Sequence, residues 1–284
     1  MITLAEKAYA KINLTLDVLH KRDDGYHDLR SVMQTVSLCD DVEIDVDTGK
    51  PWTLTSDTAS IPSDERNLAW KAVRAFFDRL GREPDGVEIR IRKCIPSEAG
   101  LAGGSADAAA VLRALNRWAG FPLSTEALCA LGAMIGSDVP FCVLGGTALV
   151  EGRGELLTKL PDAPKLYLAI CKPPVAFATP ALFRKLDSVA IRERPDTEAM
   201  RRALESGDRE RIAARLCNVF EQAVSDYPQI EAIKRKLLAS GALGAVMSGS
   251  GSAVFGVFRS PDCAQAACDA LKSDELQTFV ATTV

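Results

Sequence analysis

The chain has 284 residues, 47% hydrophobic and 25% charged, which is enough for about two globular domains with ordinary cores. A formal net charge of −4 argues against a nucleic-acid-binding protein and against an acidic membrane partner. The 8 cysteines form no C-x-x-C pair and there are 2 histidines, which argues against a zinc cluster and favours reduced thiols in the cytoplasm. The chain starts without a signal-peptide pattern and has no run of about 18 apolar residues, so no membrane span is expected.

The first clear pattern is an alternation of apolar and polar residues over residues 11–20, which predicts a strand with one polar face. Lys11 and Asn13 lie next to each other on that face. Taken alone, Lys11 is most simply interpreted as a solvated strand lysine. The alternative is a cation that stabilises an anionic ligand.

An Asp-Gly turn at residues 24–25 is followed by Tyr26 and His27. An aromatic ring beside a histidine, displayed just after a turn, is suited to stacking on a flat ring and hydrogen-bonding its edge. A tyrosine that covers the core next to a surface histidine is an equal alternative. Strands are then predicted at residues 31–38 and 42–46, and an amphipathic helix at 67–80 that ends at Gly81.

The central motif is a glycine-rich loop at residues 96–106, between a predicted strand that contains residues 87–91 and a predicted helix at 105–119. Its G-x-x-G-G spacing is neither the Walker loop nor the dinucleotide fingerprint. Free backbone N–H groups and the positive end of the helix dipole suit a bound phosphate, and the glycines let it approach closely. A small-residue helix packed tightly on a sheet is the alternative.

After a predicted helix at residues 124–134, Asp138 stands between Gly136 and an apolar run that contains Pro140. This position is at the edge of the interior, where a charge is costly unless it is paired. A catalytic carboxylate and a helix-capping aspartate are both compatible with the pattern.

The second half carries a proline-rich segment at residues 172–180, interpreted as a linker or a substrate-facing loop near the domain boundary. A second glycine cluster at residues 248–252 is either another anion cradle or a plain hairpin turn. Strands are predicted at residues 148–150, 165–171, 245–247, 253–258 and 276–280, and helices at 192–226, 230–238 and 262–271.

Together these stretches resemble the small-molecule kinase superfamily that includes galactokinase, homoserine kinase, mevalonate kinase and phosphomevalonate kinase. Within it, the chain is most similar to the family of 4-diphosphocytidyl-2-C-methyl-D-erythritol kinases of the non-mevalonate isoprenoid route. The specific part of the likeness is the D-G-Y-H segment after the lysine strand. The stretches that carry the resemblance are residues 10–14, 22–27, 100–109, 136–141 and 247–251.

The resemblance implies an α+β, two-domain small-molecule kinase fold. A ribosomal-protein-S5-like N-terminal domain with the ATP-binding loop is expected over residues 1–160, and a ferredoxin-like C-terminal domain over 161–284. It implies ATP-dependent phosphorylation of the 2-hydroxyl of a small cytidyl substrate, with Mg²⁺, in a cytoplasmic monomer or weak homodimer with no nucleic-acid or membrane partner. A superfamily kinase of the mevalonate or homoserine type, or a catalytically silent nucleotide-binding sensor, are the alternatives.

The resemblance also implies the roles of individual residues. Lys11 and Asp138 match the catalytic pair, the lysine as electrostatic partner of the phosphoryl group and the aspartate as acceptor of the hydroxyl proton. The Ser105 hydroxyl is a candidate Mg²⁺ ligand. The residues expected to bind ATP are Asn67, Leu68, Lys93, Pro96, Ser97, Glu98, Ala99, Gly100, Leu101, Ala102, Gly103, Gly104, Ser105 and Ala106. The residues expected to bind substrate are Asn13, Tyr26, His27, Thr179, Phe183, Gly249 and Ser250.

Two residues of the loop depart from the family pattern. Ala102 replaces a usual glycine, which requires an ordinary φ there or a slight shift of the loop. Glu98 must point to solvent, because a carboxylate near the triphosphate would repel it. Asp107 is interpreted as a favourable charge in the first helical turn. Phe177 lies close enough in sequence to compete with Phe183 as the ring that stacks on the cytosine.

Overall fold

The computed structural model describes residues 3–284 and divides into two compact units. Unit 1 comprises the described part of Met1–Ala10 together with Cys39–Ser97 and Ala102–Gly145. Unit 2 comprises Lys11–Leu38, Glu98–Leu101 and Gly146–Val284. Strands β1 (Thr3–Lys21) and β2 (His27–Val46) therefore contribute residues to both units.

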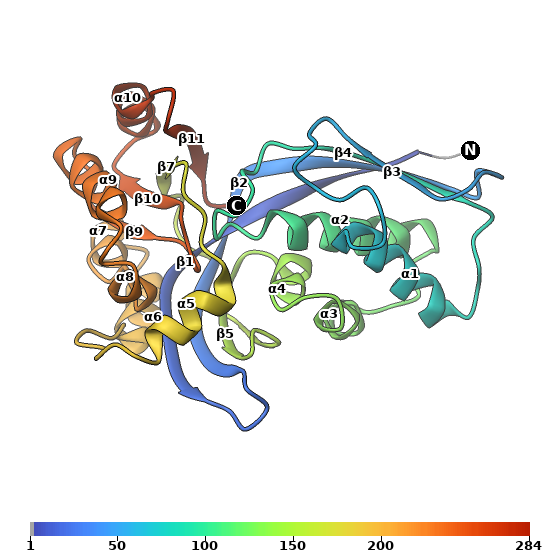
Figure 1. The fold of residues 1–284 in the computed structure, drawn as a ribbon, viewed down its shortest axis with the longest axis horizontal. Coiled ribbons are helices and arrows are strands. Elements are labelled where there is room, and N and C mark those ends of the chain that lie inside the picture. Colours follow the sequence, from blue (N-terminus) through green and yellow to red (C-terminus); the bar gives the residue numbers. More distant parts are fainter. Residues whose placement is uncertain (1–2) are drawn as a thin grey trace. The chain divides into compact units, whose positions relative to one another are not determined.

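Unit 1 is a sheet with helices (Figure 1). The last residues of β2 pair antiparallel with β4, and β3 pairs parallel with β4. Helices α1 and α2 pack on each other, and α2 also packs on α4. The elements of this unit after β2 are β3 (Thr53–Ser56), α1 (Leu68–Leu80), β4 (Val87–Arg92), α2 (Gly103–Trp118), α3 (Thr125–Ala133) and α4 (Val139–Leu144).

Unit 2 contains a four-stranded antiparallel sheet in the order β11-β7-β10-β9. Helices α9 and α10 pack against it (Figure 1). The chain runs β7, helices, β9, β10, α10, β11, which is the β-α-β-β-α-β order of a ferredoxin-like fold and confirms that expectation. The elements are β7 (Tyr167–Lys172), α9 (Pro228–Ala239), β9 (Gly244–Met247), β10 (Val254–Phe258), α10 (Pro261–Leu271) and β11 (Gln277–Thr282).

The rest of unit 2 surrounds the parts of β1 and β2 that belong to it. Strand β5 pairs with β2 and with β6, and β8 pairs parallel with β1. These elements are β5 (Thr147–Gly152), β6 (Leu156–Lys159), α5 (Thr179–Leu186), α6 (Thr197–Ser206), α7 (Arg209–Ala213), β8 (Cys217–Asn218) and α8 (Phe220–Ala223). The α+β class predicted from the sequence is confirmed.

Several predicted elements are wrong in detail. Residues 31–38 and 42–46 belong to the single strand β2. The helix predicted over 192–226 is interrupted, because Gly207 adopts a left-handed φ of 66° that ends α6 and Asp208 then caps α7. The short elements β3, β6, α5 and β8 were not predicted. None of the helices that the structure describes could span a membrane.

Candidate active site

Lys11 begins the part of β1 that lies in unit 2, and its side chain is buried. The residue is 3% exposed, and its Nζ donates a hydrogen bond to Asn13 Oδ1 at 2.8 Å. Asn13 Nδ2 donates to Ser31 Oγ at 2.8 Å, which itself donates to the Thr15 carbonyl at 2.6 Å. The interpretation of Lys11 as a solvated strand lysine is therefore wrong. A buried ammonium of this kind is retained at a cost, which is typical of a functional cation.

The middle of the glycine-rich loop packs against the second glycine cluster within unit 2. Ser248 Oγ donates to the Gly100 carbonyl at 3.0 Å, and a Cβ on Gly100 would lie 2.0 Å from the Ser248 carbonyl oxygen. A Cβ on Gly249 would lie 3.2 Å from Lys11 Nζ. The backbones can approach this closely only because both positions are glycine. Two clusters predicted separately thus meet beside the buried lysine.

Asn218, which no sequence pattern singled out, contacts the second glycine cluster. It is 3% exposed, and its Nδ2 donates to the carbonyl oxygens of Met247 at 2.7 Å and Gly249 at 2.8 Å. Its strand, β8, pairs with β1 at Leu16. The carboxamide therefore fixes the second glycine cluster relative to the lysine strand. The prediction of one helix over 192–226 hid this residue.

Glu98 lies in the same segment of unit 2 as Gly100. Glu98 is exposed, which agrees with the expectation that its carboxylate points to solvent. Its backbone has a left-handed φ of 51°. Lys172 donates hydrogen bonds to the carbonyls of Pro173 and Val175, both at 2.8 Å. Burial lowers the pKa of Lys172, and the charge of Glu98 acts in the opposite direction. The glutamate charge is thus partly balanced by a lysine of its own unit.

The end of the loop lies in unit 1, where it enters α2. Ala102 has a φ of 59°, so the expectation of an ordinary φ at this position is wrong. An alanine in the left-handed region is strained by roughly 1–2 kcal/mol. Ala102 offers no side-chain hydrogen bond to the helix start. The first amides of α2 therefore receive no capping from this residue, which suits an anion at that end of the helix.

The start of α2 is close to the segment that carries Asp138, within unit 1. A Cβ on Gly136 would lie 3.6 Å from Leu68 Cδ1 and 3.9 Å from Ser105 Oγ. Asp138, two residues later, occupies the N-cap position of α4 and is half-buried. Asp138 thus has the position predicted for a capping aspartate, although its side chain makes no capping hydrogen bond to this helix. The Ser105 hydroxyl and the Asp138 segment thus meet in one unit.

Asn67 and Lys93, both expected near the base of ATP, use their side chains inside unit 1. Asn67 caps α1: its Oδ1 accepts the Ala69 N–H at 2.9 Å and its Nδ2 donates to the Pro62 carbonyl at 2.8 Å. The Lys93 ammonium contacts Asp40 and lies 2.7 Å from Asp107 Oδ2. These contacts use one of the two donors of Asn67 Nδ2 and two of the three donors of Lys93 Nζ. At the loop entry, Ser97 Oγ lies 3.3 Å from Ser60 Oγ.

Asp40, Lys93 and Asp107 form a buried ionic cluster in unit 1. Asp40 Oδ1 also accepts the backbone N–H groups of Cys94 and Ile95 at 2.6 and 2.8 Å. Burial raises the pKa of Asp107 to about 7; the Lys93 charge opposes this and the Asp40 charge adds to it. Burial disfavours the charged form of Lys93, but the two carboxylates outweigh it, so the pKa of Lys93 is raised. Asp107 lies beyond the first turn of α2, so its interpretation as a first-turn charge is wrong.

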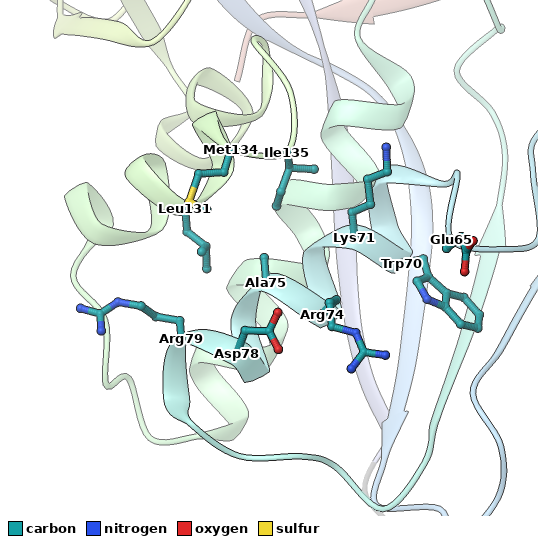
Figure 2. A pocket seen from close by; sticks show the side chains of 10 residues that line it. All are labelled: Glu65, Trp70, Lys71, Arg74, Ala75, Asp78, Arg79, Leu131, Met134 and Ile135. Atoms are coloured by element: carbon teal, nitrogen blue, oxygen red, sulfur yellow. The ribbon is translucent and has the colours of Figure 1, made fainter.

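A cavity of about 480 Å³ also lies in unit 1, between α1 and the end of α3 (Figure 2). Figure 2 shows Leu131, Met134 and Ile135 on one side and residues of α1 on the other. None of the residues expected to bind ATP lines this cavity. Its remaining lining residues are Glu65, Trp70, Lys71, Arg74, Ala75, Asp78 and Arg79.

The D-G-Y-H turn separates its two rings within unit 2. Tyr26 is 53% exposed and lies under the Arg153 guanidinium, whose Cζ is 3.7 Å from the ring centroid. His27 is 8% exposed and stacks on Phe183, with centroids 4.8 Å apart and planes 20° apart. At that separation no base fits between these two rings. One face of Phe183 is thus covered by His27, which differs from a simple sandwich of cytosine between Tyr26 and Phe183.

The structure distinguishes Phe183 from its competitor Phe177. Phe177 packs on Tyr227, with centroids 4.8 Å apart, and closely approaches Gly251. Phe183 is the ring in contact with His27, which favours it as the aromatic residue of this subsite. Nearby in sequence, Thr179 Oγ1 lies 3.0 Å from Ser250 Oγ, so these two predicted substrate residues are brought together.

Comparison with known proteins identifies the family. The GHMP kinases N-terminal domain matches residues 67–146 and the GHMP kinases C-terminal domain matches residues 200–276. A curated 4-diphosphocytidyl-2-C-methyl-D-erythritol kinase of Caldicellulosiruptor saccharolyticus is 49% identical over 98% of this chain and 96% of its own. The chain belongs to the GHMP kinases. GHMP kinases are ATP-dependent small-molecule phosphotransferases, and the two-domain α+β kinase fold expected from the sequence is confirmed.

Other GHMP kinases support the same relationship. A protein of Bacillus subtilis with the same name as the Caldicellulosiruptor relative is 44% identical over 89% of this chain and 88% of its own. A crystal structure of a 4-(cytidine 5'-diphospho)-2C-methyl-D-erythritol kinase aligns with a TM-score of 0.82 at 31% identity, covering 99% of both chains. A mevalonate kinase of L. major aligns with a TM-score of 0.73 at 17% identity over 98% of this chain and 95% of its own. At that identity the likeness shows the shared fold alone.

Proposed function

We propose that this chain is an ATP-dependent kinase that phosphorylates the 2-hydroxyl of 4-diphosphocytidyl-2-C-methyl-D-erythritol. The observation that carries the proposal is the likeness, over 98% of the chain, to a curated relative of that name at 49% identity. Solved homoserine and mevalonate kinases share 22% and 17% of their residues with this chain, which supports only a common fold. A cytidyl substrate is therefore favoured over mevalonate or homoserine.

We assign Lys11 and Asp138 as the catalytic pair. Phosphoryl transfer to an alcohol needs an aligned hydroxyl and stabilisation of charge on the transferring group. Lys11 suits the second task because its buried ammonium lies beside Asn13 and the second glycine cluster. Asp138 would accept the hydroxyl proton; support comes from its half-buried position in the segment whose Gly136 lies beside Ser105.

We assign the nucleotide to the loop of residues 96–106, with Asn67, Leu68 and Lys93 shaping the side that faces the base. Support comes from the uncapped start of α2 at Ala102 and from the position of Gly104 next to Leu68, where an added Cβ would be in van der Waals contact with Leu68 Cδ1 at 3.8 Å. Backbone amides at a helix start bind phosphate without requiring a lysine in the motif.

Mg²⁺ is the second cofactor of the proposal. Within residues 3–284, no group of three or more His, Cys, Asp or Glu side chains could hold a metal ion. Mg²⁺ is a hard cation that is held largely by water and phosphate oxygens, and the Ser105 hydroxyl would be its protein ligand. When bound, the ion would offset negative charge on the phosphates. Lys11 would add to this stabilisation of charge, and Asp138 would receive the proton of the hydroxyl.

The cytidyl substrate is assigned to residues of unit 2: Asn13, Tyr26, His27, Thr179, Phe183, Gly249 and Ser250. Support comes from the contact between His27 and Phe183 and from the pairing of Thr179 with Ser250. Stacking of a base on an aromatic ring contributes about 1–3 kcal/mol. An exposed Tyr26 is available for such a stack once Arg153 moves from its ring.

The domain boundary, the cellular compartment and the oligomeric state are the remaining parts of the proposal. A domain boundary near residue 160 is supported by family matches that fall on either side of it. Action in the cytoplasm is supported by the 8 cysteines, all free thiols in the described residues. We expect a monomer or weak homodimer that binds neither nucleic acid nor membrane, in keeping with the net charge of −4.

A coupled assay of ADP release with 4-diphosphocytidyl-2-C-methyl-D-erythritol, mevalonate and homoserine tests the proposal. We expect turnover with the cytidyl substrate alone, and near-complete loss of kcat in Asp138→Asn with little change in KM. Asp274→Asn, which changes an exposed aspartate, is the matched control and should behave as wild type. Turnover with mevalonate or homoserine contradicts the substrate assignment. An absence of turnover with intact ATP binding favours the silent sensor.

A further inference from the structure

One helix of unit 2 supplies both partners of the His27 imidazole. Phe183, near the end of α5, stacks on the ring, and Asp187, the C-cap residue one turn later, lies with Oδ1 2.7 Å from His27 Nε2. Residues four apart share one face of a helix, so the ring and the carboxylate reach the same imidazole together. The histidine is 8% exposed, and its orientation is fixed from two directions.

The carboxylate decides which imidazole nitrogen carries the proton. The hydrogen bond from His27 lowers the pKa of Asp187, while the small effect of burial opposes this, so Asp187 is ionised at neutral pH. An ionised carboxylate only accepts hydrogen bonds, so His27 Nε2 must be the donor. In the neutral imidazole the other nitrogen, Nδ1, is then an acceptor.

We propose that Asp187 is a positioning residue that selects cytosine over uracil, by holding His27 in the tautomer whose Nδ1 accepts a hydrogen bond. The inference rests on the proposed function, which brings a cytidyl group to His27. Cytosine carries an amino group where uracil carries a carbonyl oxygen. An acceptor at Nδ1 is complementary to the amino group and leaves the carbonyl facing a lone pair. A site built to pair with one group rejects an analogue that cannot make the bond.

Asp187→Asn should make the opposite tautomer of His27 accessible. The asparagine carboxamide keeps the size of the side chain but also offers an N–H donor to His27 Nε2. The tautomer with the proton on Nδ1 then becomes accessible, and that tautomer donates to the uracil carbonyl. We therefore expect Asp187→Asn to lose selectivity and not merely affinity, which a purely structural role for Asp187 would not predict.

The chain offers two matched controls. Lys21 Nζ lies 3.6 Å from Asp187 Oδ2, so Lys21→Gln removes the other charged partner of this carboxylate and leaves the His27 contact. His20 pairs with Asp28 at 3.0 Å, in the second His–Asp contact of the described residues. Because the chain has 2 histidines, His20→Gln assigns the remaining ¹⁵N imidazole signals to His27.

The experiment combines ¹⁵N NMR of the histidine rings with kinetics on the full chain. In wild type and Lys21→Gln, we expect the Nε2–H tautomer of His27 and a strong preference for the cytidyl substrate over its uridyl counterpart in kcat/KM. In Asp187→Asn, we expect a populated Nδ1–H tautomer and a preference reduced roughly tenfold or more, with the KM for ATP unchanged. Asp187→Glu, which keeps a carboxylate, should restore much of the preference.

Competition by CMP and UMP separates this inference from the proposed function. If wild type turns over the cytidyl substrate but Asp187→Asn keeps the wild-type preference, the inference is overturned and the proposed function stands. The inference is likewise overturned if wild-type His27 carries its proton on Nδ1. If wild type turns over neither substrate, yet binds CMP over UMP in an Asp187-dependent manner, the proposed function fails and the inference stands. No preference for CMP in wild type overturns the inference.

Discussion

Lys93 Nζ lies 2.7 Å from Asp107 Oδ2, in the interior of unit 1. Lys93 directly follows β4, and Asp107 belongs to α2. The same ammonium contacts Asp40, which also accepts two backbone N–H groups of the loop entry. One buried cation therefore ties the strand before the glycine-rich loop to the helix after it.

Lys93→Met should destabilise the protein strongly, because it leaves two buried carboxylates without their cation. We expect a loss of about 3–5 kcal/mol in the free energy of unfolding, measured by urea denaturation. Lys7→Met is the control, since Lys7 forms a solvent-exposed ion pair with Asp41. We expect little change in the free energy of unfolding of this variant. Equal losses in the free energy of unfolding would show that the buried cluster stabilises the protein no more than an exposed ion pair does.

The pH dependence of stability should report Asp107. The pKa of Asp107 is raised from its ordinary value of 3.8 to about 7. Between these two pH values, the folded protein holds a proton on Asp107 that the unfolded chain has released. This contribution to stability is complete below the unfolded pKa and is lost as the pH rises towards 7. From about pH 5 to about pH 8, wild type should lose up to roughly 2 kcal/mol more than Asp107→Asn. Parallel pH profiles in urea denaturation would contradict this assignment.

Gly100→Ala should be severely destabilising. Its Cβ would lie 2.0 Å from the Ser248 carbonyl oxygen, and the residue has a φ of 74°. We expect a loss of about 3 kcal/mol or more, together with reduced kcat/KM for ATP. In Gly81→Ala the φ is 63° but nothing lies within 4 Å of the added Cβ, so backbone strain of about 1–2 kcal/mol is the whole cost. Similar losses in the free energy of unfolding in both variants would contradict a steric clash between the added Cβ and Ser248.

Ala102→Gly should stabilise the protein. The φ of 59° strains an alanine, and glycine relieves that strain at the cost of more freedom in the unfolded chain. We expect a net gain of roughly 0.5–1 kcal/mol in the free energy of unfolding. The same change at Ala266, exposed in α10, should cost about 0.5–1 kcal/mol in thermal or urea denaturation. A loss at both positions would mean that the loop tolerates alanine without strain.

Sequence periodicity was sufficient for the strand that carries Lys11 and for the two elements that flank the glycine-rich loop. The alternation around Lys11, the strand before the loop and the helix after it are all local patterns, and the structure has β1, β4 and α2 there. The family resemblance then supplied the fold class, because the motifs occur in the family's order along the chain.

Contacts between distant residues were not accessible in this way. Lys93 and Asp40 are 53 positions apart, and Asn218 and Gly249 are 31 positions apart. Neither pair leaves a trace in local periodicity, since each depends on which strands become neighbours. The stacking of His27 on Phe183 was likewise hidden, because α5 had no strong pattern of its own.

The amide of Asn218 reaches its two carbonyls from a strand of only 2 residues. The glycine turn that it supports therefore depends on the register of that short strand, and not on the length of chain that leads to it. We expect a change in the number of residues between α6 and α7 to leave the turn in place, provided that β8 keeps its register. A slip of β8 by one position along β1 would instead rotate the carboxamide to the opposite face and release both carbonyls at once.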